Sequence, residues 1–203
     1  MIPNGVCASF WDSGGRDGSS KRIVCVALFR PEKRQEDLVV ALSQLSAERV
    51  DFECVFAGDG PNRTKVESLV TKFGLADRIR FLGHIDRQLV RELLARSGIF
   101  VLPSAVEGLP LSVMEAMANG LPIVATHAGG TAELVVHTET GFLVPPRRPD
   151  LIAKYVKKLL DDPEMRLAMG NVGRRRMQEQ FSLQSMVEQT ANLYLRVARN
   201  SEN

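Results

Sequence analysis

The chain has 203 residues and a mass of 22.4 kDa, with 44% hydrophobic and 25% charged residues, which is typical of a globular protein. A net charge of +2 is too balanced to indicate nucleic-acid binding, and we expect no such partner. The longest apolar run, Ile23 to Phe29, is too short to cross a membrane, and Met1 to Ser20 lacks the pattern of a secretory signal.

The chain opens with glycine- and serine-rich turn signals, so we expect Met1 to Ser20 to form a connector. Short apolar runs then follow one another, and few of them alternate with polar residues, which is typical of parallel strands buried on both faces. The predicted strands are Ile23–Phe29, Phe52–Ala57, Ile79–Leu82, Ile99–Leu102, Pro122–Ala125 and Phe142–Val144.

Between the first five strands lie four segments with apolar residues at helical spacing. They are Glu36–Ala47, Asn62–Phe73, Asp86–Ser97 and Leu109–Asn119. This regular alternation predicts an α/β fold with a doubly wound parallel sheet of about six strands flanked by helices.

After Pro145-Pro146 the sequence predicts three successive helices, at Asp150–Leu160, Pro163–Gln180 and Leu183–Arg199. From Val144 to Met177 there are nine Lys and Arg residues against four Asp and Glu. A solvated helical surface is the simpler explanation of this excess, and contact with the anionic inner leaflet of a membrane is the alternative.

Three cysteines are an odd number with no metal-binding spacing. Cys25 and Cys54 lie inside predicted strands, so we interpret them as reduced core thiols of a cytoplasmic protein.

The most informative segment runs from Pro103 to Glu133. A strand ends there, a loop carries Ser104 and Glu107, and a helix that includes Glu115 begins near Pro110. A helix N-terminus at the carboxyl end of a strand offers free N–H groups to an anion. Two carboxylates beside an anion site favour a ligand that also has hydroxyl groups, such as a nucleotide sugar. For either carboxylate taken alone, a solvated helix-end residue is the favoured explanation.

Basic residues follow the first strand in Arg30-Pro31-Glu32-Lys33-Arg34. At that edge of the sheet, Arg30 and Lys33 suit a diphosphate, although a polar loop with incidental charge is the alternative. The turn Gly58-Asp59-Gly60-Pro61 follows the second strand and is not a dinucleotide-binding fingerprint.

These motifs together resemble the C-terminal, nucleotide-sugar-binding domain of retaining GT-B glycosyltransferases of glycosyltransferase family 4. The similarity runs from an Ile2-Pro3-Asn4-Gly5-Val6 motif to the tail helices and includes Phe81-Leu82-Gly83. Its most specific part is the E-x7-E pair of Glu107 and Glu115 inside an E-G-L-P…E-A-M-A block. The resemblance implies a Rossmann-like half of a GT-B fold, with the connector at 1–20 and the nucleotide-sugar-binding domain at 21–203.

The resemblance also implies roles for individual residues. Lys33 and Arg30 would hold the diphosphate, Glu107 would lie beside the transferred sugar, and Glu115 would accept from the ribose hydroxyls. We therefore expect Glu107, Lys33 and Arg30 to act in catalysis. The predicted nucleotide-sugar-binding set is Lys33, Arg30, Gly83, His84, Ser104, Glu107, Gly108, Leu109, Pro110, Leu111 and Glu115.

One position departs from the family pattern. Many members have an arginine five residues before the lysine, and Leu28 stands there in this chain. We expect Arg30, two residues further on, to replace it.

The histidines give little further indication of function, and the sequence lacks the acidic motif of many metal-dependent transferases. His84 either lines the base pocket or makes one loop hydrogen bond, His127 is interpreted as structural, and His137 is given no role. The sequence contains no D-x-D motif, so we expect no metal and no other cofactor, and a UDP-, GDP- or ADP-sugar as the donor.

The predicted function is that of the donor-binding part of a hexosyltransferase that acts on a glycan or lipid-linked acceptor. The acceptor domain is expected to be missing from this chain, which would then be inactive alone. A non-catalytic nucleotide-sugar-binding module and a GT-B-like nucleotide-sugar epimerase are the alternatives, and the E-G-L-P…E-A-M-A block argues against the epimerase. We expect a cytoplasmic location, with peripheral contact to the membrane as an option.

Overall fold

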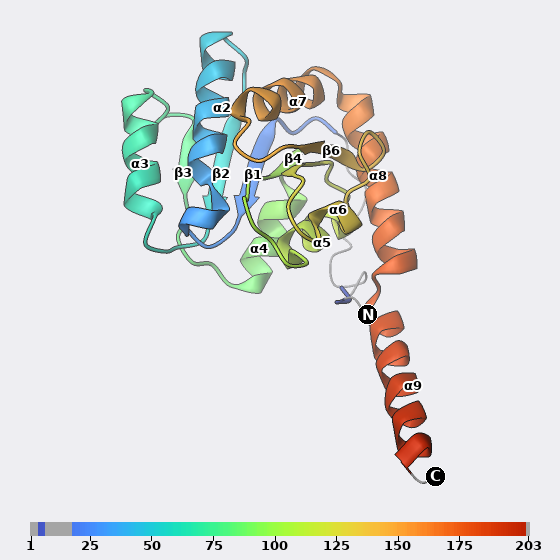
Figure 1. Cartoon of the computed structure of the whole chain (residues 1–203). Helices are drawn as coiled ribbons and strands as arrows, with labels where there is room; N and C mark the ends of the chain where they lie inside the picture. The colour runs from blue at the N-terminus through green and yellow to red at the C-terminus, as the bar shows by residue number, and fades with distance from the viewer. Residues whose placement is uncertain (1–3, 7–17, 202–203) are drawn as a thin grey trace.

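The computed structural model describes residues 4–6 and 18–201, which form one parallel sheet covered by helices on both faces (Figure 1). The sheet has six strands in the order β3-β2-β1-β4-β5-β6, and every neighbouring pair is parallel. This order confirms the predicted doubly wound, Rossmann-like architecture. The strands are β1 (Arg22–Val26), β2 (Glu53–Ala57), β3 (Ile79–Phe81), β4 (Ile99–Leu102), β5 (Ile123–Thr126) and β6 (Gly141–Val144).

Helices connect the strands and continue after the last one. A 3-10 turn, η1 (Pro31–Lys33), precedes the first long helix. The helices are α2 (Gln35–Ala47), α3 (Arg63–Lys72), α4 (Arg87–Ala95), α5 (Leu111–Ala118), α6 (Thr131–Leu134), α7 (Pro149–Asp161), α8 (Pro163–Gln180) and α9 (Leu183–Ser201). The four helices between the first five strands and the three tail helices confirm the predicted pattern to within a few residues at each end.

The direction in which strands are added reverses between β1 and β4, which are neighbours in the sheet although β2 and β3 lie between them in sequence. At such a switch point the loops after the two strands diverge and leave a crevice at the carboxyl edge of the sheet. The loop that follows β1 therefore lies beside the loop that follows β4.

Two apolar clusters, one on each face of the sheet, form the core. The first joins Ile23 and Cys25 to α2, α3 and α7, and the second joins Val24 and Phe100 to α4 and α5. Both cysteines are buried and free, as predicted. Burial raises the pKa of the Cys25 thiol to about 12 and that of Cys54 well above its usual value, so both remain protonated.

The first strand is shorter than predicted. It ends at Val26, and the next residues stay beside the end of β2 and the turn that follows it, while the register with β4 already stops at Val24. The Ala27 N–H donates to the Ala57 carbonyl at 3.1 Å, and the Phe29 N–H donates to the Asp59 carbonyl at 2.9 Å. The apolar run continues to Phe29, so the sequence did not indicate where the regular strand ends.

The basic tail does not form one charged face. Arg166 is buried and donates to the carbonyls of Leu159, Leu160 and Gly18. Arg174 donates to the Asn119 carbonyl at 3.1 Å, and Arg176 donates to carbonyls near α6. Three of the nine basic residues of this segment, Arg166, Arg174 and Arg176, thus serve packing within the domain. Helix α9 extends away from the sheet (Figure 1).

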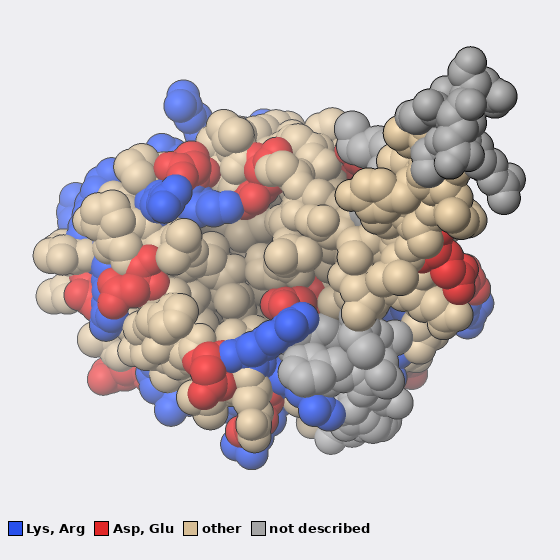
Figure 2. Space-filling model, turned by 90° about the horizontal axis from the view of Figure 1, so that it is seen from below, with Lys and Arg blue, Asp and Glu red and all other residues tan. Residues whose placement is uncertain are grey.

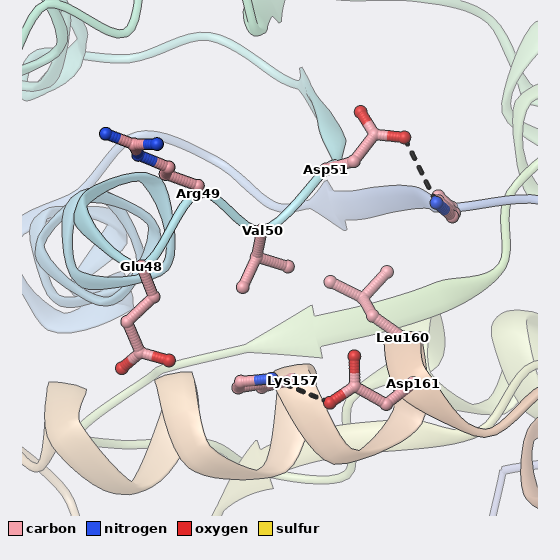
Figure 3. Close-up of a pocket in the computed structure, with 8 residues that line it drawn as sticks. Glu48, Arg49, Val50, Asp51, Lys157, Leu160 and Asp161 are labelled. Atoms are coloured by element: carbon pink, nitrogen blue, oxygen red, sulfur yellow. Dashed lines mark hydrogen bonds and ion pairs between the residues drawn. The ribbon is translucent and has the colours of Figure 1, made fainter.

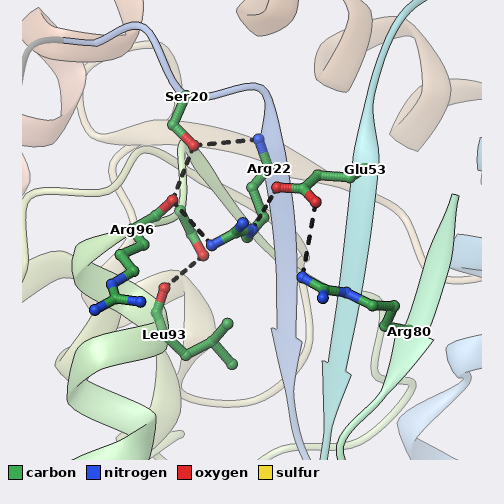
Figure 4. A network of polar contacts seen from close by, with 7 residues as sticks. Ser20, Arg22, Glu53, Arg80, Leu93 and Arg96 are labelled. Carbon is green, nitrogen blue, oxygen red and sulfur yellow. Dashed lines mark hydrogen bonds and ion pairs between the residues drawn. The ribbon is translucent and has the colours of Figure 1, made fainter.

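Polar contacts hold the amino end of β1 (Figure 4). Arg22 Nε donates to Glu53 Oε1 at 2.6 Å, and Arg80 Nη2 lies 3.9 Å from Glu53 Oε2 on the next strand. Ser20 Oγ donates to the Arg96 carbonyl at 2.9 Å, which joins the start of β1 to the end of α4. These contacts lie at the sheet edge opposite the switch-point crevice.

The predicted connector, 1–20, lies mostly outside the described residues. Of its described parts, Val6 is buried and forms a parallel bridge with Ser182, and Gly5 donates to the Met186 sulfur at 3.2 Å. Residues 4–6 therefore pack against the junction of α8 and α9. Within the described residues, no helix has the length and apolar character needed to cross a bilayer.

We expect Arg166→Ala to destabilise the domain by about 1–3 kcal/mol for each buried carbonyl left without a donor. The control is Arg175→Ala on the same helix, because the Arg175 side chain is exposed and makes no hydrogen bond among the described residues. Urea denaturation measures both free energies of unfolding. Equal losses in the two variants would contradict the structural role of Arg166.

Candidate functional site

The two loops at the switch point are joined by an ion pair. Lys33 Nζ, at the end of η1, donates to Glu107 Oε1, in the loop after β4, at 2.7 Å. The Glu107 side chain is only 6% exposed and that of Lys33 is 23% exposed. Residues 74 positions apart in sequence thus meet in a place that is largely shielded from water.

Backbone hydrogen bonds keep these loops together. The Ala105 N–H, next to the strand end of β4, donates to the Glu32 carbonyl in η1 at 2.7 Å. The Lys33 N–H donates to the Arg30 carbonyl at 2.9 Å and closes the 3-10 turn, while Gln35 Nε2 donates to the Leu28 carbonyl at 2.9 Å. The position of Lys33 therefore depends on the backbone and not only on its contact with Glu107.

A glycine turn after β2 supports the loop that carries Lys33. Gly58 has a φ of +133°, and a Cβ there would lie 2.0 Å from the Ala27 carbonyl oxygen. Gly60 has a φ of +151°, and a Cβ there would lie 2.5 Å from the Phe29 carbonyl oxygen. Only glycine permits this approach, so the G-x-G turn supports the neighbouring loop.

A second glycine pair supports the loop that carries Glu107. A Cβ on Gly129 would lie 1.8 Å from the Glu107 carbonyl oxygen, and the Gly130 N–H donates to the Gly108 carbonyl at 2.7 Å. The sequence analysis assigned no role to Gly129 and Gly130. The signal that could have indicated more was the glycine doublet directly after a buried strand.

The N-terminus of α5 opens into the same crevice. Pro110 is its N-cap, and no acceptor among the described residues takes the N–H groups of Gly108, Leu109 or Leu111. Free N–H groups and the positive end of the helix dipole attract an anion. The helix start predicted near Pro110 is present, and it follows the loop that carries Glu107.

Glu115 lies within α5, and its side chain is 17% exposed. Burial raises the pKa of its carboxyl group above the usual value, and the Arg87 guanidinium, 3.9 Å away at the start of α4, partly opposes this rise. Nothing in the sequence pattern pointed to Arg87, because it comes from a different βα unit.

The remaining predicted residues differ in how far their side chains are buried. Arg30 is exposed, and its side chain makes no hydrogen bond or ion pair among the described residues. Leu28, at the usual arginine position, is 49% exposed. Ser104 is fully buried beneath the crevice, with its carbonyl accepting from Thr126 Oγ1 and no partner for its own hydroxyl in the described chain.

Gly83 and His84 follow β3. The Gly83 carbonyl accepts from the Gly58 N–H at 2.7 Å, so this segment adjoins the glycine turn, and His84 is exposed. His137 Nδ1 accepts from the Leu143 N–H at 3.0 Å, and the His137 ring packs near Phe142, which is a structural contact.

In Figure 1 the strands run downward, so Figure 2 shows the carboxyl edge of the sheet from below. It shows a shallow recess with neutral residues in its floor and adjacent acidic and basic side chains at its borders (Figure 2).

Two other hollows contain none of the predicted site residues. A polar pocket of about 300 Å³ lies between the end of α2 and α7, where the Lys157–Asp161 and Lys21–Asp51 ion pairs already neutralise much of its charge (Figure 3). An apolar groove of about 310 Å³ runs along α4 beside Leu82 and Leu89. Among the described residues, no group of three or more His, Cys, Asp or Glu side chains is placed to hold a metal ion.

Comparison with known proteins identifies a family for this chain. Residues 11–176 match the family model of the glycosyl transferases, group 1. The chain belongs to this family.

Individual relatives cover nearly the whole chain. N-acetyl-alpha-D-glucosaminyl L-malate synthase of Bacillus anthracis is 35% identical over 93% of this chain and 49% of its own length. The sucrose-phosphate synthase structure from Thermosynechococcus elongatus has a TM-score of 0.89 at 28% identity, over 98% of this chain and 52% of that one. The Anabaena Alr3699/HepE complex with UDP-glucose has a TM-score of 0.86 at 24% identity, over 95% of this chain and 56% of that one. This glycosyl transferase domain thus spans about half the length of the curated relatives it matches.

We expect Gly129→Ala to be more destabilising than Gly74→Ala. Both glycines have a positive φ, but a Cβ on Gly74 would meet nothing within 4 Å, whereas one on Gly129 would overlap the Glu107 carbonyl. Left-handed backbone alone costs about 1–2 kcal/mol, so the excess loss at Gly129 measures the close approach. Urea denaturation of both variants gives the comparison, and equal losses would contradict the supporting role.

We expect Glu115 to make a pH-dependent contribution to stability, because its carboxyl pKa is raised in the folded protein. Because its pKa is raised in the folded protein, the wild type loses stability as the pH rises from the ordinary glutamate pKa, about 4.3, through the raised value. The variant Glu115→Gln lacks this loss, so its stability relative to the wild type should increase over that range and then level off. Urea denaturation at a series of pH values measures it, and a difference independent of pH would contradict the assignment.

Proposed function

We propose that this chain is the donor-binding part of a glycosyltransferase that moves a hexosyl group from a nucleoside-diphosphate sugar with retention of the anomeric configuration. The observation that carries the proposal is the meeting of Lys33, Glu107 and the α5 N-terminus at the switch-point crevice. It combines a cation, a shielded carboxylate and free N–H groups, which is what a phosphorylated sugar requires.

The diphosphate would bind to Lys33, to Arg30 and to the N–H groups of Gly108 and Leu111. Negative charge grows on the leaving diphosphate as the glycosidic bond breaks, and these groups would stabilise that charge. Arg30 is exposed and can reach toward a ligand at the cost of side-chain entropy only. With these cations present, we propose that the site does not require a resident metal ion.

Carboxylates would recognise the hydroxyl groups of the donor. Glu107 would accept hydrogen bonds from the transferred sugar, and Glu115, inside α5 and so further from the phosphates, would accept from the ribose. Gly83 and His84 after β3 would border the base.

The names of relatives support nucleotide-sugar chemistry. One Corynebacterium glutamicum relative, 32% identical, is named as GDP-mannose-dependent, and the structure of the Anabaena protein contains UDP-glucose. Because this chain spans about half of such proteins, we propose that a glycan or lipid-linked acceptor binds to the other half and that this chain alone transfers little.

Calorimetric titration of this chain with UDP, GDP, ADP and the corresponding sugar nucleotides tests the proposal. We expect saturable binding of one base series. Absence of saturable binding by any of them would contradict a donor site.

We expect Lys33→Ala to weaken binding of the preferred diphosphate by at least about tenfold, because a charge-assisted hydrogen bond to phosphate is lost. The matched control is Lys72→Ala at the exposed end of α3, which removes the same charge. That end of α3 leads into the start of β3, at the edge of the sheet opposite the crevice. Calorimetry measures both dissociation constants. Equal effects of the two substitutions would show that Lys33 acts only through the overall charge of the domain.

A further inference from the structure

The Lys33–Glu107 ion pair joins two groups that the proposed function assigns to different parts of the donor. Lys33 would take the diphosphate and Glu107 the sugar, yet in this structure they bind each other at 2.7 Å. A ligand that engages Lys33 therefore changes the surroundings of the Glu107 carboxylate, whether or not that ligand carries a sugar.

A diphosphate bound to Lys33 must either share the ammonium group with Glu107 or displace it. An ammonium has three N–H donors, so sharing is possible, but it places phosphate oxygens close to the carboxylate. Displacement leaves the Glu107 side chain, which is only 6% exposed, without its cation. Both arrangements are unfavourable, because like charges repel and a shielded charge needs a partner.

The loop cannot easily move the carboxylate away. The Gly129 backbone lies against the Glu107 carbonyl, and Gly130 donates to the Gly108 carbonyl at 2.7 Å. On the other side, the Ala105 N–H is bonded to the Glu32 carbonyl at 2.7 Å. The backbone on both sides of Glu107 is therefore held, and only side-chain rotation remains.

A sugar attached to the diphosphate makes binding at Lys33 less unfavourable for Glu107. Its hydroxyl groups are hydrogen-bond donors that can satisfy the carboxylate after Lys33 has turned to the phosphates. A nucleoside diphosphate without sugar has no such hydroxyls at that place. Its terminal phosphate also titrates with a pKa near 6, so it carries more negative charge at neutral pH than an esterified phosphate.

We propose, on the basis of the donor-binding function proposed above, that the Lys33–Glu107 pair makes this site discriminate between the sugar-bearing donor and the nucleoside diphosphate that remains after transfer. The Glu107 carboxylate repels the diphosphate whether or not a sugar is attached. Only the hydroxyl groups of the sugar offset that repulsion. Loss of the sugar then weakens the hold on the nucleotide, which favours release of the spent product.

The test compares dissociation constants for a nucleotide and its sugar conjugate in wild type and Glu107→Gln. The probes are UDP with UDP-glucose, GDP with GDP-mannose and ADP with ADP-glucose, and the pair that the wild type binds is then used throughout. Glutamine keeps the shape of the side chain but removes its charge. Glu107→Ala serves as a second variant if the glutamine form does not fold, as judged by thermal denaturation.

The matched control is Glu32→Gln. Glu32 precedes Lys33 in η1, so this change alters the net charge equally but leaves the Lys33–Glu107 contact in place. An effect of overall charge would appear in both variants, whereas an effect of the ion pair would appear only at position 107.

We expect Glu107→Gln to bind the free diphosphate more tightly than the wild type does. The preference for the sugar conjugate over the diphosphate should fall by about fivefold or more, the lower end of typical coupling between sites. Glu32→Gln should keep the wild-type preference.

Two results would overturn the inference, and they are distinguishable. If the wild type binds nucleotides but Glu107→Gln keeps the same preference, or binds the diphosphate more weakly, the carboxylate does not discriminate and the donor site itself still stands. If the wild type binds no nucleotide at all, the proposed function fails and this inference fails with it.

Discussion

The adjacency of β1 and β4 is the constraint on which the site depends. Because these strands are neighbours in the sheet, the loops after them share one crevice, and Lys33 comes within 2.7 Å of Glu107. A carboxylate so well shielded from water needs a cation or several hydrogen-bond donors. In the structure Lys33 supplies the cation. In the proposed function the diphosphate binds Lys33, and the sugar hydroxyls bind Glu107.

Glycine positions set how tightly the two loops are held. Gly58 and Gly60 bring the turn after β2 against Ala27 and Phe29, and Gly129 brings the turn after β5 against Glu107. None of these glycines is assigned a contact with the proposed phosphate. Their role is to let backbones approach more closely than any side chain would allow, which limits the ways in which the charged groups can rearrange.

The basic side chains of the tail helices have a different role from those at the crevice. Arg166 and Arg174 donate to backbone carbonyls of neighbouring segments, and they act as packing residues with several donors in a fixed geometry. The basic excess of this region in sequence is therefore no measure of the charge that the surface presents. Arg30 differs, because it is exposed at the edge of the crevice.

The sequence by itself determined the fold class, the succession of strands and helices, and the two motifs that contain Lys33 and Glu107, because apolar periodicity and turn residues are local signals. It did not determine that β1 ends at Val26, that Arg87 faces Glu115, or that Gly129 lies against the Glu107 loop. Each of these contacts joins segments distant in sequence, and no local pattern specifies which carbonyl or carboxylate a distant group will meet. Only the packing of the sheet and its loops decided how the predicted residues pair.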